Sequence, residues 1–79
     1  MKAYGLSLED FNRMLGDQEG KCYICGPNSE GKLCVDHDHK TKKVRKLLCD
    51  RCNRMIGAAR ENPRILRAAA HYLFGYGKL

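Results

Sequence analysis

Two cysteine pairs with the same spacing constrain this chain more than any other feature of its sequence. They are Cys22/Cys25 and Cys49/Cys52. The two residues inside each pair let both sulfurs turn towards one ion, and four thiolates in a closed tetrahedral site are typical ligands of structural zinc. Disulfides and unrelated core cysteines are the alternatives. The shared spacing favours one zinc ion held by all four cysteines.

The small size of the chain favours the same interpretation. The chain has 79 residues, which suits one domain. A core of this size often needs a disulfide or a structural metal for a comfortable stability margin. The cysteine count of 5 is odd, so a complete disulfide framework would leave one thiol over. We expect Cys34, between the apolar Leu33 and Val35, to be a half-buried strand thiol.

The sequence has no stretch with the character of a signal peptide, and no apolar run approaches the roughly 20 residues that cross a bilayer. We therefore expect no membrane partner and a location in the cytoplasm. Paired cysteines in that reducing compartment bind metal more often than they form disulfides.

Local signals predict a small α+β fold. Ser7 and Asp10 have the capping pattern of a helix start, and Asn62-Pro63 joins a cap residue to a proline at the first helical position. The expected elements are a helix over about 7–15, a zinc knuckle, strands over 33–37 and 44–48, and helices over about 50–60 and 63–74. We expect residues 1–79 to form a single domain with its core at 22–60.

The segment between the cysteine pairs carries an acidic and histidine-rich run, Asp36-His37-Asp38-His39, and Asn53 directly follows the last cysteine. Phosphodiester hydrolysis needs a base for water and a cation for the phosphate. His37 suits the base, and the oxygens of Asp36 and Asn53 suit a hard cation such as magnesium. Alternation along a strand separates Asp36 from His37, so a shared site requires irregular backbone at or after Asp36.

Each of these residues also has a simpler explanation. His37 and His39 suit a second zinc ion or a solvated loop, and Asp36 and Asp38 suit ion pairs with nearby lysines. Asn53 suits an ordinary helix position. The combination of all of them with the cysteine pairs and a basic surface favours catalysis.

The basic surface is the segment Lys40–Arg54, called the basic stripe below. The chain has a net charge of +6, and the stripe holds seven basic residues and one acidic residue, Asp50. A solvated surface that aids solubility is the simple interpretation, and a polybasic membrane patch is another. Beside a metal site, the stripe is better interpreted as a phosphate-binding surface that contacts DNA.

Together these motifs resemble the recombination endonuclease VII family of the HNH, or ββα-metal, nucleases, which is widespread in bacteriophages. The resemblance rests on the segments 22–26, 35–39 and 44–53. It implies a zinc-clamped ββα-metal fold with an added helix at each end, and cleavage of DNA to 5′-phosphate and 3′-hydroxyl ends. It also implies a location in the host cytoplasm, with phage recombination or packaging proteins as partners.

The resemblance implies a role for each motif residue. Asp36 and Asn53 bind the catalytic Mg²⁺ or Mn²⁺, His37 is the general base, and His39 contacts or orients the phosphate. The four paired cysteines hold the structural zinc. The best-known members continue into a long C-terminal extension that grips branched junctions, so for this chain we expect nicking or cutting of duplex DNA.

The chain departs from the family pattern at Lys42 and Lys46, where members commonly carry glycine. We expect a different turn there, because lysine replaces glycine only where the backbone tolerates a side chain. The main alternative function is a non-catalytic zinc module that binds nucleic acid, and a protein-interaction domain is another. Neither explains why Asp36 and His37 stand together. The oligomeric state stays open.

Overall fold

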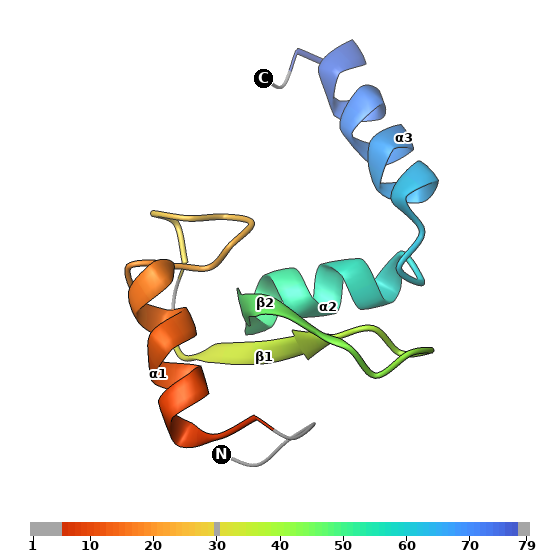
Figure 1. Ribbon diagram of the computed structural model, residues 1–79. Coiled ribbons are helices and arrows are strands. Elements are labelled where there is room, and N and C mark those ends of the chain that lie inside the picture. Colours follow the sequence, from red (N-terminus) through yellow and green to blue (C-terminus); the bar gives the residue numbers. More distant parts are fainter. Residues whose placement is uncertain (1–5, 30, 78–79) are drawn as a thin grey trace.

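The computed structural model describes residues 6–29 and 31–77. In chain order the elements are α1 (Leu8–Asp17), β1 (Leu33–His37), β2 (Val44–Cys49), α2 (Asp50–Ala58) and α3 (Pro63–Gly75) (Figure 1). This order of elements is the predicted one. The remaining residues of the predicted domain, 1–5, 30 and 78–79, lie outside the described residues.

The helix starts follow the sequence signals. The Ser7 hydroxyl accepts a hydrogen bond from the Asp10 N–H at 3.0 Å, and the Asp10 carboxylate accepts one from the Ser7 N–H at 3.3 Å. This reciprocal capping box begins α1. Asn62 caps α3 by accepting from the Arg64 N–H at 2.9 Å, with Pro63 in the first turn. Both predicted helix starts are confirmed.

The two strands form an antiparallel hairpin with an irregularity opposite Asp36. Val35 pairs with Leu47, and His37 pairs with Val44. The two pairs are two residues apart on β1 but three apart on β2, so β2 carries one extra residue. Such a bulge bends the strand and redirects its side chains. The pairing is thus irregular opposite Asp36, with the extra residue on β2, and a departure of the β1 backbone itself at or after Asp36 stays a prediction.

Helix α1 is joined to β2 through one glutamine. The Gln18 side-chain amide donates to the Leu47 carbonyl at 3.0 Å, and its Oε1 accepts from the Leu47 N–H at 2.9 Å. Leu47 itself is fully buried. The end of α1 therefore satisfies the backbone of a central core residue that the hairpin leaves unpaired.

The core is built around the cysteines. Buried apolar side chains in the described residues are few, and half of them are cysteines of the two pairs: Cys22, Leu47, Leu48, Cys49, Cys52 and Ala59. Cys25, Leu33 and Ile56 pack against this cluster. Helix α2 packs on both strands of the hairpin. The cluster lies at the start of α2, because Cys49 is the N-cap of this helix and Cys52 lies in its first turn. Folding and metal binding thus involve the same residues.

Helix α3 extends away from the hairpin and α2 (Figure 1). Several of its large apolar side chains are exposed, among them Ile65, Tyr72, Leu73 and Phe74. None of the helices in the described ranges has the length and apolar character needed to cross a membrane.

Candidate active site and metal centre

The four paired cysteines converge on one point. Their sulfur atoms all lie within 4.8 Å of one another, and Cys25 Sγ is 3.6 Å from Cys49 Sγ. A disulfide would hold two sulfurs about 2.05 Å apart. Any two thiolates bound to one tetrahedral zinc ion lie about 3.8 Å apart, given Zn–S bonds of about 2.3 Å. The cluster is therefore positioned to bind a metal ion, and four thiolates suit zinc.

The pKa values of the clustered thiols are shifted in opposite directions. Burial, together with hydrogen bonds from the other thiols, raises the pKa of Cys52 to about 12. Burial also raises the pKa of Cys25. For Cys22 burial is opposed by hydrogen bonds from backbone N–H groups, including that of Ile24, and the pKa falls to about 6. Metal binding must therefore displace protons from Cys25 and Cys52.

The cluster fixes the start of α2. Cys49 is the N-cap of this helix, and its sulfur accepts a hydrogen bond from the Cys52 N–H at 3.5 Å. A metal held there connects the first cysteine pair to the helix that carries Asn53. Asn53 is half-buried in the first turn of α2.

A second group of polar residues surrounds Asp36, whose residue surface is only 7% exposed. Arg45 Nε donates to Asp36 Oδ2 at 2.6 Å, and Arg45 Nη2 donates to Asp36 Oδ1 at 3.1 Å. The hydrogen bonds to Asp36 raise the pKa of the Arg45 guanidinium. The buried carboxylate thus already holds a positive group, which is the charge a metal ion would bring.

Glu61 extends this network to the histidine run. Its Oε1 lies 3.0 Å from Arg45 Nη2, and its Oε2 lies 3.1 Å from His39 Nε2. Arg45 Nη2 also donates to the His37 carbonyl at 3.1 Å. The rings of His37 and His39 are 5.1 Å apart, centroid to centroid. The Arg45 guanidinium therefore contacts Asp36, the His37 carbonyl and Glu61, and Glu61 connects it to His39.

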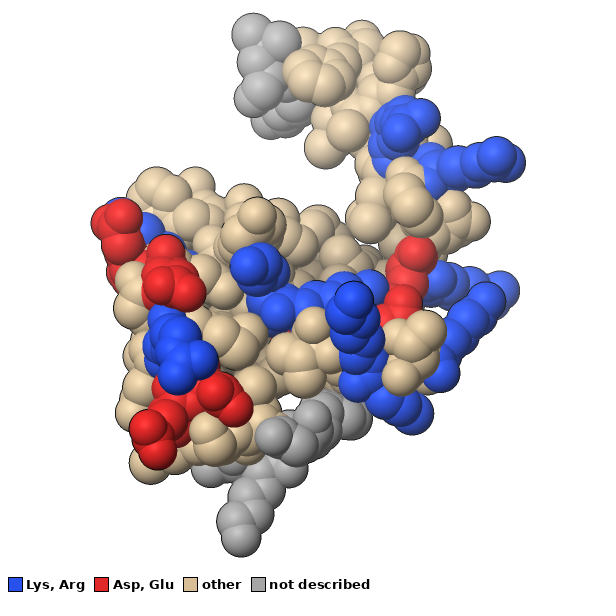
Figure 2. All heavy atoms as spheres, in the orientation of Figure 1, with Lys and Arg blue, Asp and Glu red and all other residues tan. Residues whose placement is uncertain are grey.

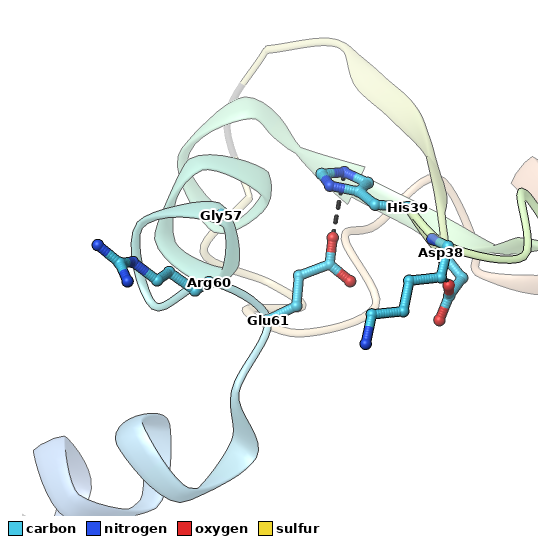
Figure 3. A pocket seen from close by; sticks show the side chains of 6 residues that line it. Asp38, His39, Gly57, Arg60 and Glu61 are labelled. Atoms are coloured by element: carbon cyan, nitrogen blue, oxygen red, sulfur yellow. Dashed lines mark hydrogen bonds and ion pairs between the residues drawn. The ribbon is translucent and has the colours of Figure 1, made fainter.

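A cavity of about 450 Å³ adjoins this network. It is lined by Asp38, His39, Lys40, Gly57, Arg60 and Glu61. Figure 3 shows Glu61 reaching from the end of α2 towards His39, whereas Arg60 points away from both. His39 and Glu61 are the two members of the network that line this cavity, and the His39 imidazole is exposed there.

The simpler explanations for the acidic residues are only partly correct. Asp36 pairs with an arginine, not a lysine. Asp38 accepts hydrogen bonds from the backbone N–H groups of Lys40 at 2.8 Å and Thr41 at 2.9 Å, which hold the hairpin loop. These N–H groups, Thr41 first, lower the pKa of Asp38. Asp38 is therefore a loop residue.

The basic stripe is divided by the fold. Arg45 is turned inward, while Lys40, Lys42 and Lys43 are exposed on the hairpin loop. The other members contact their own surroundings: Arg51 donates to the Asn28 carbonyl, Arg54 pairs with Asp50, and Lys46 lies over the Tyr23 ring. Figure 2 shows Lys and Arg side chains gathered over the hairpin loop and the α3 side, and Asp and Glu side chains over α1.

Arg45 and Glu61 are the two site residues that the sequence did not single out. Arg45 counted only as one charge of the stripe, although a hairpin that pairs Val35 with Leu47 brings it opposite Asp36. That register was a usable signal. Glu61 had none, because it lies beyond α2 and comes near His39 only through the turn that follows this helix.

Lys42 keeps a left-handed backbone conformation, with φ of 66°. The backbone thus accepts the lysine side chain at positive φ at an energetic cost, and the different turn that we expected stays a prediction. Lys46 has no such conformation and lies on β2. Cys34 is half-buried on β1, as predicted.

Comparison with known proteins identifies the family. Two relatives are called Gene 59 protein, one from Mycobacterium phage D29 (44% identical over 77 residues) and one from Mycobacterium phage L5 (38% identical over 76 residues). Each match covers 92% of this chain and 46% of the relative, so the chain spans about half the length of these relatives. No solved structure matches significantly. Residues 1–75 match the recombination endonuclease VII family, and the chain belongs to that family.

Proposed function

We propose that this chain is the catalytic domain of a metal-dependent DNA endonuclease of the HNH type. The observation that carries the proposal is a buried carboxylate, Asp36, connected through Arg45 and Glu61 to His39, whose ring lies 5.1 Å from that of His37, on a hairpin with exposed lysines. The family supplies the reaction class, which is nuclease cleavage. HNH chemistry, metal dependence and the product ends are parts of the proposal.

The residues present fit a hard divalent cation. Asp36 already binds a cationic group through both carboxylate oxygens, and α2, which carries the amide of Asn53, packs on β1. We assign the oxygens of Asp36 and Asn53 as ligands of Mg²⁺ or Mn²⁺. When bound, this ion offsets negative charge on the scissile phosphate and on the leaving oxygen.

The protein's own groups perform the remaining tasks. His37 takes a proton from the attacking water, because imidazole is the side chain best suited to proton transfer at neutral pH. His39, exposed beside the cavity, donates a hydrogen bond to a phosphate oxygen. The exposed lysines of the hairpin loop contact neighbouring phosphates of the DNA, which positions the backbone and carries no direct sequence information.

The proposal explains an arrangement that simple nucleic-acid binding does not. A non-catalytic zinc module needs the cysteines and lysines only. A buried acidic group among phosphate-binding residues weakens binding unless it holds a cation, and here its environment is already suited to one.

Incubation with supercoiled plasmid distinguishes the two functions. We expect nicking or cutting by the zinc-loaded protein when Mg²⁺ or Mn²⁺ is added, none when both ions are left out, and products that a ligase can reseal. Retained DNA binding without any cleavage, under all metal conditions, would select the binding module instead. Supercoiled and branched substrates compared in one assay also give the substrate preference.

A further inference from the structure

Glu61 lies outside the motif that defines the site, yet both of its carboxylate oxygens contact the site. Oε1 lies 3.0 Å from Arg45 Nη2, and Oε2 lies 3.1 Å from His39 Nε2. The Glu61 side chain is 21% exposed, so it is partly shielded from water. Figure 3 shows it reaching across from the α2–α3 connection to the hairpin. The Glu61 carboxylate thus connects His39 to Arg45.

The backbone that presents Glu61 is in an uncommon conformation. Arg60 and Glu61 have φ of 56° and 55°, in the left-handed region that side chains other than glycine's rarely adopt. The Glu61 N–H donates back to the Ile56 carbonyl at 2.8 Å, which ends α2 and turns the chain towards the hairpin. Two consecutive residues of this kind persist where surrounding contacts hold them. The contacts of Glu61 with Arg45 and His39 are such contacts.

We propose that Glu61 is a positioning residue of this site, orienting His39 through one oxygen and Arg45 through the other. The catalytic consequence rests on the nuclease function proposed above. With Nε2–H of His39 donating to Glu61, the ring is fixed, and Nδ1 can donate to a phosphate oxygen when the ring carries protons on both nitrogens. A carboxylate partner commonly fixes a catalytic imidazole in this way.

The contact with Arg45 has a second consequence. Arg45 Nη2 serves Asp36, the His37 carbonyl and Glu61 together. If Asp36 binds a divalent ion, the guanidinium loses part of its pairing with Asp36. Glu61 then keeps the arginine paired beside the site, so that it does not compete freely for the carboxylate.

An ordinary salt bridge that stabilises the turn after α2 is the simpler interpretation. It predicts that loss of Glu61 lowers thermal stability and leaves the environment of the His39 ring as it was. The positioning role predicts the reverse emphasis: an altered His39 ring in a protein that is still folded and zinc-loaded. NMR signals of the histidine rings separate the two.

The test uses Glu61→Gln, which keeps the shape of the side chain and removes its charge. Glu19→Gln is the matched control, because Glu19 is an exposed glutamate with the same φ of 55°. We expect Glu61→Gln to shift the ring signals of His39 and the Nε–H signal of Arg45, with the His71 ring on α3 unchanged. Glu19→Gln should move none of the three.

Kinetics on plasmid DNA supply the second readout. Removal of a partner that orients a catalytic group typically costs about 10- to 100-fold. We expect Glu61→Gln to lose this factor in kcat with KM nearly unchanged, because the contact orients a reacting group and does not bind DNA. Glu61→Asp, which keeps the charge but shortens the reach, should also lower kcat and shift the His39 signals.

Unchanged His39 and Arg45 signals in both Glu61 variants would overturn the proposal, as would a kcat equal to that of Glu19→Gln. Should the wild-type protein cut no DNA, the nuclease proposal fails by itself. The ring signals then still decide whether Glu61 orients His39, because they are measured on the protein without substrate.

Discussion

Arg45 holds the Asp36 carboxylate at two points, with Nε–Oδ2 and Nη2–Oδ1 distances of 2.6 and 3.1 Å. Paired N–H donors in this fork geometry give the strongest form of arginine–carboxylate contact. The pairing allows an acidic side chain to be buried in a domain whose core is very small. It also places Arg45 in competition with any cation that binds Asp36.

Replacing Arg45 by alanine should therefore destabilise the protein and strengthen its affinity for divalent ions. Breaking a buried pair costs about 3–5 kcal/mol, and we expect about 2–3 kcal/mol because the Arg45 side chain is 36% exposed. Mg²⁺ should restore part of this loss by taking the place of the guanidinium. Urea unfolding with and without Mg²⁺ measures the first effect, and Mn²⁺ titration by calorimetry measures the second.

Arg54→Ala is the control for Arg45→Ala. Arg54 pairs with Asp50 on the exposed face of α2, and such surface pairs contribute about 0–1 kcal/mol. It should change neither stability nor metal affinity appreciably. Equal Mn²⁺ affinity in Arg45→Ala and Arg54→Ala would contradict the competition between Arg45 and the metal.

Loss of the cysteine cluster should unfold the domain. Structural zinc binds zinc-finger peptides with about 10–16 kcal/mol, comparable to the entire stability of a domain at about 5–15 kcal/mol. Cys49 is 1% exposed and caps α2, so Cys49→Ser removes a ligand and disturbs a core position at once. Circular dichroism and zinc content by mass spectrometry of the intact protein check this.

Cys34→Ser is the matched control for Cys49→Ser, because Cys34 is a half-buried thiol on β1 and not a member of the cluster. It should keep both the zinc and the fold. A stably folded, zinc-free Cys49→Ser protein would show that the core does not depend on the metal.

Zinc affinity should fall as the pH falls, because protons compete for the thiolates. Cys52, with a pKa raised to about 12, and Cys25, also raised, are protonated at neutral pH and release protons on binding. Cys22 has its pKa lowered from 9.0 to about 6, so it is ionised at pH 7 and releases a proton only near or below pH 6.

The same shift at Cys22 affects the zinc-free protein. A group whose pKa is lower in the folded state stabilises the fold above its unfolded pKa, here 9.0, and loses this contribution as pH falls through about 6.

Calorimetry in buffers of different ionisation enthalpy counts the protons that zinc displaces. A zinc affinity independent of pH between 6 and 8 would show that the cysteines are not the ligands.

The sequence predicted the local elements well, and for physical reasons. Capping at Ser7 and Asn62 depends on residues a few positions apart, and the hairpin follows from two short apolar strands. The cysteine spacing predicted the cluster because the two-residue gap lets both sulfurs of each pair face one ion. The order of helices and strands was therefore accessible without a structure.

The network around Asp36 was less accessible, because it depends on tertiary contacts. Asp36 and Arg45 meet through the hairpin register, and Glu61 meets His39 through the turn after α2. A long charged side chain can reach many partners, so its type alone does not identify the one it contacts. Whether Asn53 and Asp36 share an ion stays a prediction.

His37→Ala should abolish most cleavage while leaving the protein folded. Loss of a general base typically costs about 10²–10⁴-fold in rate. His71→Ala is the matched control, because His71 is an exposed histidine on α3. Plasmid nicking rates at saturating Mg²⁺ measure the difference, and activity of His37→Ala equal to that of His71→Ala would remove His37 from the mechanism.

Lys42→Gly should stabilise the hairpin. An L-residue in the left-handed region costs about 1–2 kcal/mol, and glycine removes this cost but loses about 0.5–1 kcal/mol through its greater freedom in the unfolded chain. At Lys42, with φ of 66°, the net gain should be about 0–1.5 kcal/mol. Lys43→Gly is the matched control, since Lys43 is also exposed and has no positive φ, so the same loss of charge should leave stability unchanged or lower.

The two variants also separate the effect of charge on DNA binding from the effect of the backbone. If the hairpin lysines contact phosphates, Lys42→Gly and Lys43→Gly should weaken DNA binding similarly and reduce its dependence on salt. Equal stability of the two variants would show that the left-handed turn at Lys42 costs the protein nothing.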